Sequence, residues 1–193
     1  MSKRAPRTRG SSGRPKKRRA ALTPRETTVF EDETGFTLHP RVGRGWAKRG
    51  QRLRVATRSA HRERLNLFGW VAPLLGRHGV RRHPHGNHEG FLATLRHLRH
   101  ALRGYTVWLY VDRAVWHRGD EVKAFLASHR DVHLDDLPTY QPGLNVQERI
   151  WRQTRYDATT NQYFEQLDDI WNAVRTRTRR WSPSMVRRLC HIS

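Results

Sequence analysis

The sequence predicts an α/β domain with a mixed central sheet flanked by helices. Three strand-like runs come first and suit a meander, which needs only short connections between antiparallel strands. Strand-like and helix-like segments then alternate, as expected for two crossover strands that join the same sheet. The run TVWLYV at residues 106–111 is short, apolar and β-branched, which is typical of a buried central strand.

The first half of the chain supplies the meander. Residues 28–40 are rich in β-branched and aromatic side chains and stop at a proline, so they predict the first strand. The glycine-rich residues 41–51 predict a long hairpin loop, and 52–58 and 64–75 predict the second and third strands. A loop is expected over 76–87, where glycine, histidine and arginine predominate.

The second half supplies helices and two crossover strands. From His88 to Leu102, leucines and a phenylalanine recur at helical spacing, which predicts an amphipathic helix. The same reasoning yields strands at 106–112 and 132–138 and helices at 120–129, 144–154 and 163–181.

Charge points to a polyanionic partner. The 193 residues include 38 Lys and Arg against 17 Asp and Glu, a formal charge of +21. Such an excess favours double-stranded DNA, because each phosphate that is neutralised releases counterions. The single cysteine, Cys190, excludes an internal disulfide and a four-cysteine zinc site. With no membrane-length apolar run and no signal segment, we expect a cytoplasmic, nucleoid-associated protein with no membrane partner.

Basic residues concentrate in three places. Residues 1–27 predict a disordered basic arm in which Lys16, Lys17, Arg18 and Arg19 contact DNA; the alternative is a solvated tail. Arg81 and Arg82 lie among His78, His83, His85 and His88, and DNA contact is a better interpretation there than a metal site. Residues 182–193 predict a basic C-terminal tail.

Acidic residues are scarce, so their positions are informative. Asp32 lies in the first strand, Asp112 ends the buried central strand, and Glu148 lies in the first turn of a helix. Groups at the carboxyl ends of strands converge in an open α/β sheet. Three carboxylates without basic partners favour Mg²⁺ or Mn²⁺, and two such ions suit phosphodiester chemistry.

Each carboxylate also has a purely structural interpretation. Asp32 could be a solvated strand residue while Glu31 or Glu33 points inward. Asp112 could cap the turn that follows it. Glu148 stands three residues after Asn145, the spacing of a capping box.

The sequence motifs around these carboxylates resemble those of the catalytic (DDE) domain of bacterial insertion-sequence transposases of the mariner-like superfamily, in the insertion sequence 630 group. FEDETGFTLHP with GWAKRGQ is similar to that family's first block, and WLYVDRAVWH to its second. LPTYQPGLNVQERIWRQ is similar to the third, and the 36 positions from Asp112 to Glu148 are typical of the group.

The resemblance implies an RNase H-like fold over residues 28–181, with Asp32, Asp112 and Glu148 as catalytic metal ligands for Mg²⁺ or Mn²⁺. It implies DNA cleavage and 3′-hydroxyl strand transfer at transposon ends and target, by a homo-oligomer. His117 would lie near the site and touch the scissile phosphate of DNA or a metal-bound water, or serve only as a polar residue at a helix start.

Two departures from the family pattern qualify the expected function. Arg113 replaces the usual asparagine, so it would pair with Asp112 or contact DNA. Only the basic arm precedes the first strand where the family has a helix-turn-helix region, so we expect either the second half of a split transposase, with a separate helix-turn-helix half, or a decayed copy. The rival functions are a catalytically silent DNA-binding fragment and a general RNase H-like nuclease or resolvase.

Overall fold

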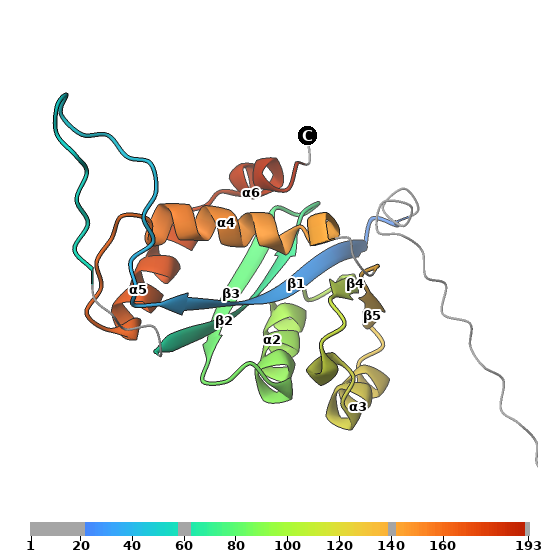
Figure 1. Cartoon of the computed structure of the whole chain (residues 1–193). Helices are drawn as coiled ribbons and strands as arrows, with labels where there is room; N and C mark the ends of the chain where they lie inside the picture. Colours follow the sequence, from blue (N-terminus) through green and yellow to red (C-terminus); the bar gives the residue numbers. More distant parts are fainter. Residues whose placement is uncertain (1–21, 58–62, 139–141, 192–193) are drawn as a thin grey trace, which may run out of the picture.

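A five-stranded mixed sheet forms the centre of the protein (Figure 1). The computed structural model describes residues 22–57, 63–138 and 142–191. The strand order is β3-β2-β1-β4-β5. The antiparallel pairs β1–β2 and β2–β3 form the meander, and β4 and β5 add in parallel. The strands are β1 Glu26–Thr37, β2 Arg64–Ala72, β3 Arg77–His83, β4 Thr106–Val111 and β5 Val132–Asp136. The predicted fold class is thereby confirmed.

Helices cover both faces of the sheet (Figure 1). On one side lie α2 and α3 with the short 3₁₀ helix η1, and on the other lie α4, α5 and α6. Their bounds are α2 His88–Ala101, η1 Val115–His117, α3 Asp120–Ser128, η2 Pro142–Leu144, α4 Gln147–Ala158, α5 Leu167–Thr178 and α6 Pro183–Leu189.

Helix α2 forms where its apolar spacing predicts it. The Asn87 side chain accepts a hydrogen bond from the backbone N–H of Gly90 (3.1 Å) and so caps the first turn. Its apolar face, including Phe91 and Leu95, is fully buried against Phe68 and Trp70 of β2. Burial of this stripe fixes the helix on the sheet.

Helix α4 packs very closely on the opposite face. A side chain at Gly69 of β2 would place its Cβ 2.4 Å from the Trp151 ring and 2.5 Å from the Gln147 side chain. Glycine is therefore required at this position. Because Gly69 is the β2 partner of Asp32, this contact also brings the first turn of α4 toward Asp32.

The third strand of the meander is not where the sequence predicted it. The described residues 52–57 form no strand, and the pairing partner of β2 is instead 77–83, which we expected to be a loop. Pro73 to Gly76 form the intervening turn, with Gly76 at a φ of +63°. Strand β3 lies at the sheet edge and buries only Gly79 fully, so its sequence lacks an apolar pattern.

The two ends of the chain also differ from expectation. The segment interpreted as a basic tail forms α6, which is capped by Ser182 and buries Val186 beside Tyr110 and Ile150. At the other end β1 begins at Glu26, inside the range expected for the basic arm. Lys16, Lys17, Arg18 and Arg19 lie outside the described residues. Within the described ranges, no helix is both long and apolar enough to cross a bilayer.

Trp151 and Trp46 offer a matched test of this packing. Trp151 is 2% exposed, whereas Trp46, on the loop that projects from the domain between β1 and β2, is completely exposed. We expect Trp151→Ala to lower the free energy of unfolding by about 3–5 kcal/mol, the cost of a large core cavity. Trp46→Ala should change it by less than about 0.5 kcal/mol. Urea denaturation measures both, and equal effects would contradict the assigned core.

Candidate active site

The candidate site lies where β1 and β4 stop pairing. Their parallel register runs from Glu26–Thr106 to Phe30–Tyr110 and ends there. Asp32 and Asp112 each stand two residues beyond that last pair. The edge of β1 is open at this point, so side chains from both strands can meet there. Carboxylate oxygens of Asp32, Glu33 and Asp112 all lie within 4.8 Å of one another.

Glu148 joins this group from the first turn of α4. Asn145, just before the helix, is buried; its side chain donates to the backbone oxygen of Glu31 (3.2 Å) and accepts from the N–H of Gln147 (3.1 Å). The start of α4 is thus fixed directly to β1. The capping-box alternative is not what the structure shows, because Val146 is the N-cap residue and no side chain caps it.

Burial and repulsion both act on Asp32. Burial first, and then the negative charges of Glu33, Asp112 and Glu148, raise the pKa of Asp32 to about 7. A carboxyl group that its neighbours repel so strongly is stabilised as an anion by a cation. Clustered oxygen ligands without an arginine or lysine among them are the donor set that Mg²⁺ and Mn²⁺ prefer. The residues therefore fit a divalent ion.

The orientation of the Asp112 carboxylate is fixed by hydrogen bonds within its own loop. The carboxylate accepts from the backbone N–H of Ala114 (2.9 Å) and lies 3.2 Å from Nδ1 of His117. The hydrogen bond with His117 holds the pKa of Asp112 below its ordinary value, and the Ala114 bond acts in the same direction. The turn-capping role and the place in the acidic cluster therefore coexist.

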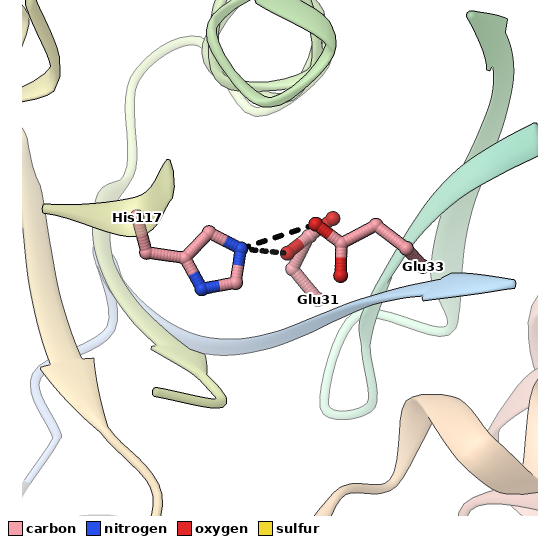
Figure 2. A group of neighbouring side chains, drawn as sticks. All are labelled: Glu31, Glu33 and His117. Carbon is pink, nitrogen blue, oxygen red and sulfur yellow. Dashed lines mark hydrogen bonds and ion pairs between the residues drawn. The ribbon is translucent and has the colours of Figure 1, made fainter. Parts of the chain in front are cut away.

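His117 is buried beneath the cluster, with 1% of its side chain exposed. Figure 2 shows its ring pointing toward Glu31 and Glu33, with Nε2 3.7 Å from Glu31 and 3.1 Å from Glu33. Burial would lower the pKa of His117, but bonds to Asp112 and Glu33 and the charge of Glu31 raise it to about 10. The ring has almost no open surface in this structure, and its expected contact with DNA stays a prediction.

Glu31 and Glu33 are site components that sequence reasoning treated only as alternatives to Asp32. Strand alternation places both on the face opposite Asp32, toward η1. Glu31 is fully buried, and burial together with the charge of Glu33 raises its pKa well above the ordinary value. Two glutamates at alternate positions of an apolar strand were the available signal.

Arg113 does not pair with Asp112. Its Nε lies 4.0 Å from Asp136 at the end of β5, and Arg118 binds the same carboxylate at 2.6 Å. Asp136, an unexpected acid in a strand, thus has basic partners next to the site. The Arg113 side chain is half exposed and borders the open edge of the cluster.

A basic cavity lies along the edge strand β3. Its volume is about 390 Å³, and its lining includes Arg81, Arg82, Arg175 and Arg179. Arg82 is held by an ion pair with Asp168 and lies over the Trp171 ring. The histidines of the segment are separated: His78 and His83 belong to β3, and none of the four joins a metal-compatible group within the described ranges.

The fold and the acidic cluster define a class of nucleic-acid enzymes. A family model described as DDE superfamily endonuclease matches residues 27–171, so the chain belongs to this family. A curated relative, the "Insertion element IS630 uncharacterized 39 kDa protein" of Shigella sonnei, is 28% identical over 150 residues, which are 76% of this chain and 42% of that protein. The chain therefore carries a DDE superfamily endonuclease domain, and it resembles this IS630 protein in sequence.

Solved structures show the same RNase H-like fold. The Mos1 transposase paired-end complex with left transposon end has a TM-score of 0.67 at 15% identity and covers 91% of this chain and 54% of that one. The catalytic domain of Mos1 mariner transposase has a TM-score of 0.59 at 15% identity, with 91% and 80% covered. The chain spans less than half of the curated relative and about half of the transposase in the paired-end complex.

Repulsion within the cluster predicts a stabilising substitution in metal-free protein. Because the folded pKa of Asp32 is raised from 3.8 to about 7, Asp32 lowers stability as the pH rises through that window. At pH 8 we expect Asp32→Asn to raise the free energy of unfolding by about 1–3 kcal/mol, after allowing for partial exposure.

The matched control for Asp32→Asn is Asp120→Asn. Asp120 is exposed and paired with Lys123, which holds its pKa below the ordinary value, so this change should not stabilise. Adding Mg²⁺ should raise the melting temperature of wild type more than that of Asp32→Asn. Thermal melts with chelator and with Mg²⁺ measure both effects. A wild type that is insensitive to Mg²⁺ would count against the cation site.

Proposed function

We propose that this chain is the catalytic domain of a DNA transposase, and that it cleaves DNA strands and joins a 3′-hydroxyl to target DNA with the help of Mg²⁺ or Mn²⁺. The carrying observation is the cluster of Asp32, Glu33 and Asp112 at the open edge of β1, together with the negative charge of Glu148 that acts on Asp32. Among the described residues neither Asp32 nor Glu148 forms a salt bridge, although the charge of Arg155 interacts with Asp32, and a divalent cation would supply the positive charge that these carboxylates lack.

Asp32, Asp112 and Glu148 would hold the ions, with Glu33 beside them. Two bound ions supply an activated oxygen nucleophile and stabilise the oxygen that leaves in phosphodiester chemistry. The chain's own contribution is position: Asn145 fixes the start of α4 to β1, Gly69 allows α4 to approach, and Ala114 orients Asp112. These contacts support the proposal that the three carboxylates would act together without a rearrangement at the moment of reaction.

DNA would lie across the open edge of the cluster, where exposed cations surround it. Arg113 and Arg118 border the site next to Asp136, and the β3 cavity presents further guanidinium groups to phosphates. The solved Mos1 complexes are titled as complexes with a transposon end and with Mn or Mg. They support transposon ends as substrate and a divalent cofactor for this chain, and we propose that it acts as a homo-oligomer. A separate helix-turn-helix half would read the ends.

Catalysis is tested by removing each carboxylate. Asp32→Ala, Asp112→Ala and Glu148→Ala should each lower Mg²⁺-dependent nicking and strand transfer by at least about a hundredfold, because each removes a ligand of the ions. Asp120→Ala removes an exposed acid on α3 and should leave activity unchanged. Equal activity in all five proteins would refute the site. Activity absent from every protein, with DNA binding intact, would favour the silent DNA-binding fragment.

DNA binding by this chain alone should be tight at low salt and nearly independent of the DNA sequence. The basic surface would bind DNA through phosphate contacts. The logarithm of the DNA affinity should therefore fall against the logarithm of the salt concentration, with a slope of about −0.9 per phosphate neutralised. Residues 1–21 hold nine basic residues, and their removal leaves β1 intact while lowering the slope. Salt titrations on transposon-end and scrambled duplexes measure this. A preference for the end above roughly a thousandfold would show a base-reading element within this chain.

A further inference from the structure

His117 is enclosed by aromatic rings on the side away from the carboxylates. Its ring centroid is 4.3 Å from that of Phe91 on α2 and 6.1 Å from that of Trp116 on η1. With 1% exposure the imidazole has no path to DNA in this conformation. The polar contacts of the imidazole are with the acidic residues of the site.

Both ring nitrogens face oxygen atoms only. Nδ1 lies 3.1 Å from the backbone oxygen and 3.2 Å from the carboxylate of Asp112, while Nε2 lies 3.1 Å from Glu33. Oxygens accept, so both nitrogens donate. The ring therefore connects the segment after β4 with β1 at the point where the two strands no longer pair.

Glu33 and Asp112, which His117 connects, differ in the other hydrogen bonds that they accept. Oε1 of Glu33 also accepts from Nε1 of Trp116 at 2.7 Å, so Glu33 keeps a donor without the histidine. Within the part of the chain that the structure describes, Asp112 has only the Ala114 N–H besides His117, and its side chain is 56% exposed. Asp112 depends on the ring more than Glu33 does.

Glu31 supplies the reason that the ring stays in place. Glu31 is fully buried, and neither of its carboxylate oxygens has a hydrogen-bond partner among the described residues. Its ion-pair partner is Nε2 of His117, at 3.7 Å. Moving the imidazole away would leave a buried carboxylate without a counter-charge, which is strongly unfavourable. Figure 2 shows this arrangement, with Glu31 and Glu33 on the same side of the ring.

We propose that His117 is a positioning residue, which fixes the Asp112 carboxylate relative to β1 for metal binding and is itself retained by the buried Glu31. This inference rests on the proposed function, since it assumes that Asp112 is a metal ligand. Outer-sphere partners that orient a ligand typically contribute 10–100-fold to metal affinity. The competing interpretation is that Nε2 of His117, with Glu31 and Glu33, binds a cation directly, as their spacing allows.

Two substitutions of His117 distinguish its hydrogen bond to Asp112 from its hydrogen bond to Glu33. The amide nitrogen of an asparagine can stand near Nδ1, and that of a glutamine near Nε2. His117→Asn should therefore keep the donor to Asp112 and retain Mn²⁺ affinity within about threefold of wild type. His117→Gln should keep the donor to Glu33, lose the one to Asp112, and bind Mn²⁺ 10–100-fold more weakly.

Mn²⁺ affinity and stoichiometry are measured by electron paramagnetic resonance on the whole chain without DNA, with melting temperatures alongside. The control is His97→Gln, which changes a half-buried histidine that hydrogen-bonds Trp70 outside the site and should leave affinity unchanged. Equal affinities for the Asn and Gln variants overturn the proposal. So does a loss of one bound ion in both variants, which indicates a directly coordinated cation.

Failure of the inference is distinguishable from failure of the proposed function. If Asp112→Ala and Asp32→Ala bind Mn²⁺ as wild type does, the metal site itself is wrong. If Asp112→Ala and Asp32→Ala lose Mn²⁺ binding while both His117 variants bind Mn²⁺ as wild type does, only the positioning role is wrong.

Should neither His117 variant fold, wild type labelled with ¹⁵N at histidine provides the test. The ring signals of His117 should shift during a Mg²⁺ titration with the midpoint seen for protection against melting, because Asp112 changes partner. Unchanged signals overturn the proposal.

Discussion

The end of the β1–β4 pairing at Phe30–Tyr110 is the constraint on which the site depends. Beyond that pair β1 still bonds to β2 on one side, but its other edge is open. Residues that follow either strand therefore face a gap instead of a backbone partner. The chain fills the gap with carboxylates from β1, from the segment after β4 and from α4. Their mutual repulsion opposes folding, so the surrounding packing has to hold them together.

That packing is supplied from both faces of the sheet. On one face α4 approaches so closely that only glycine fits at position 69, and Asn145 ties its first turn to the backbone of β1. On the other face the η1 turn inserts His117 between Asp112 and the glutamates of β1. A rigid scaffold of this kind holds like charges together in the absence of a ligand, which is the condition for strong cation binding.

Much of this could be predicted from sequence, and the exceptions have physical causes. Buried elements such as 106–111 and α2 carry periodic apolar patterns, because one face or both must leave water. Strand β3 carries no such pattern: it is an edge strand with arginines on its surface, which protect an unpaired edge. Helix α6 is only seven residues long and very basic, so its buried Val186 gave too weak a signal against the charge.

The site shows the same division. Asp32, Asp112 and Glu148 could be selected because scarce acids follow strands or begin a helix, and because their surroundings match a family. The roles of Glu31, Glu33 and His117 depend on which way side chains point around a strand edge, and sequence alone does not determine that. His117 was expected near the site because the family resemblance implies it. A neighbouring strand with two acids on its inner face gives the ring a stronger set of partners, and burial beneath the cluster follows from it. The exposed groups of the site are Asp112, Glu148 and the arginines around them, and these are the groups that DNA would meet in the proposed function.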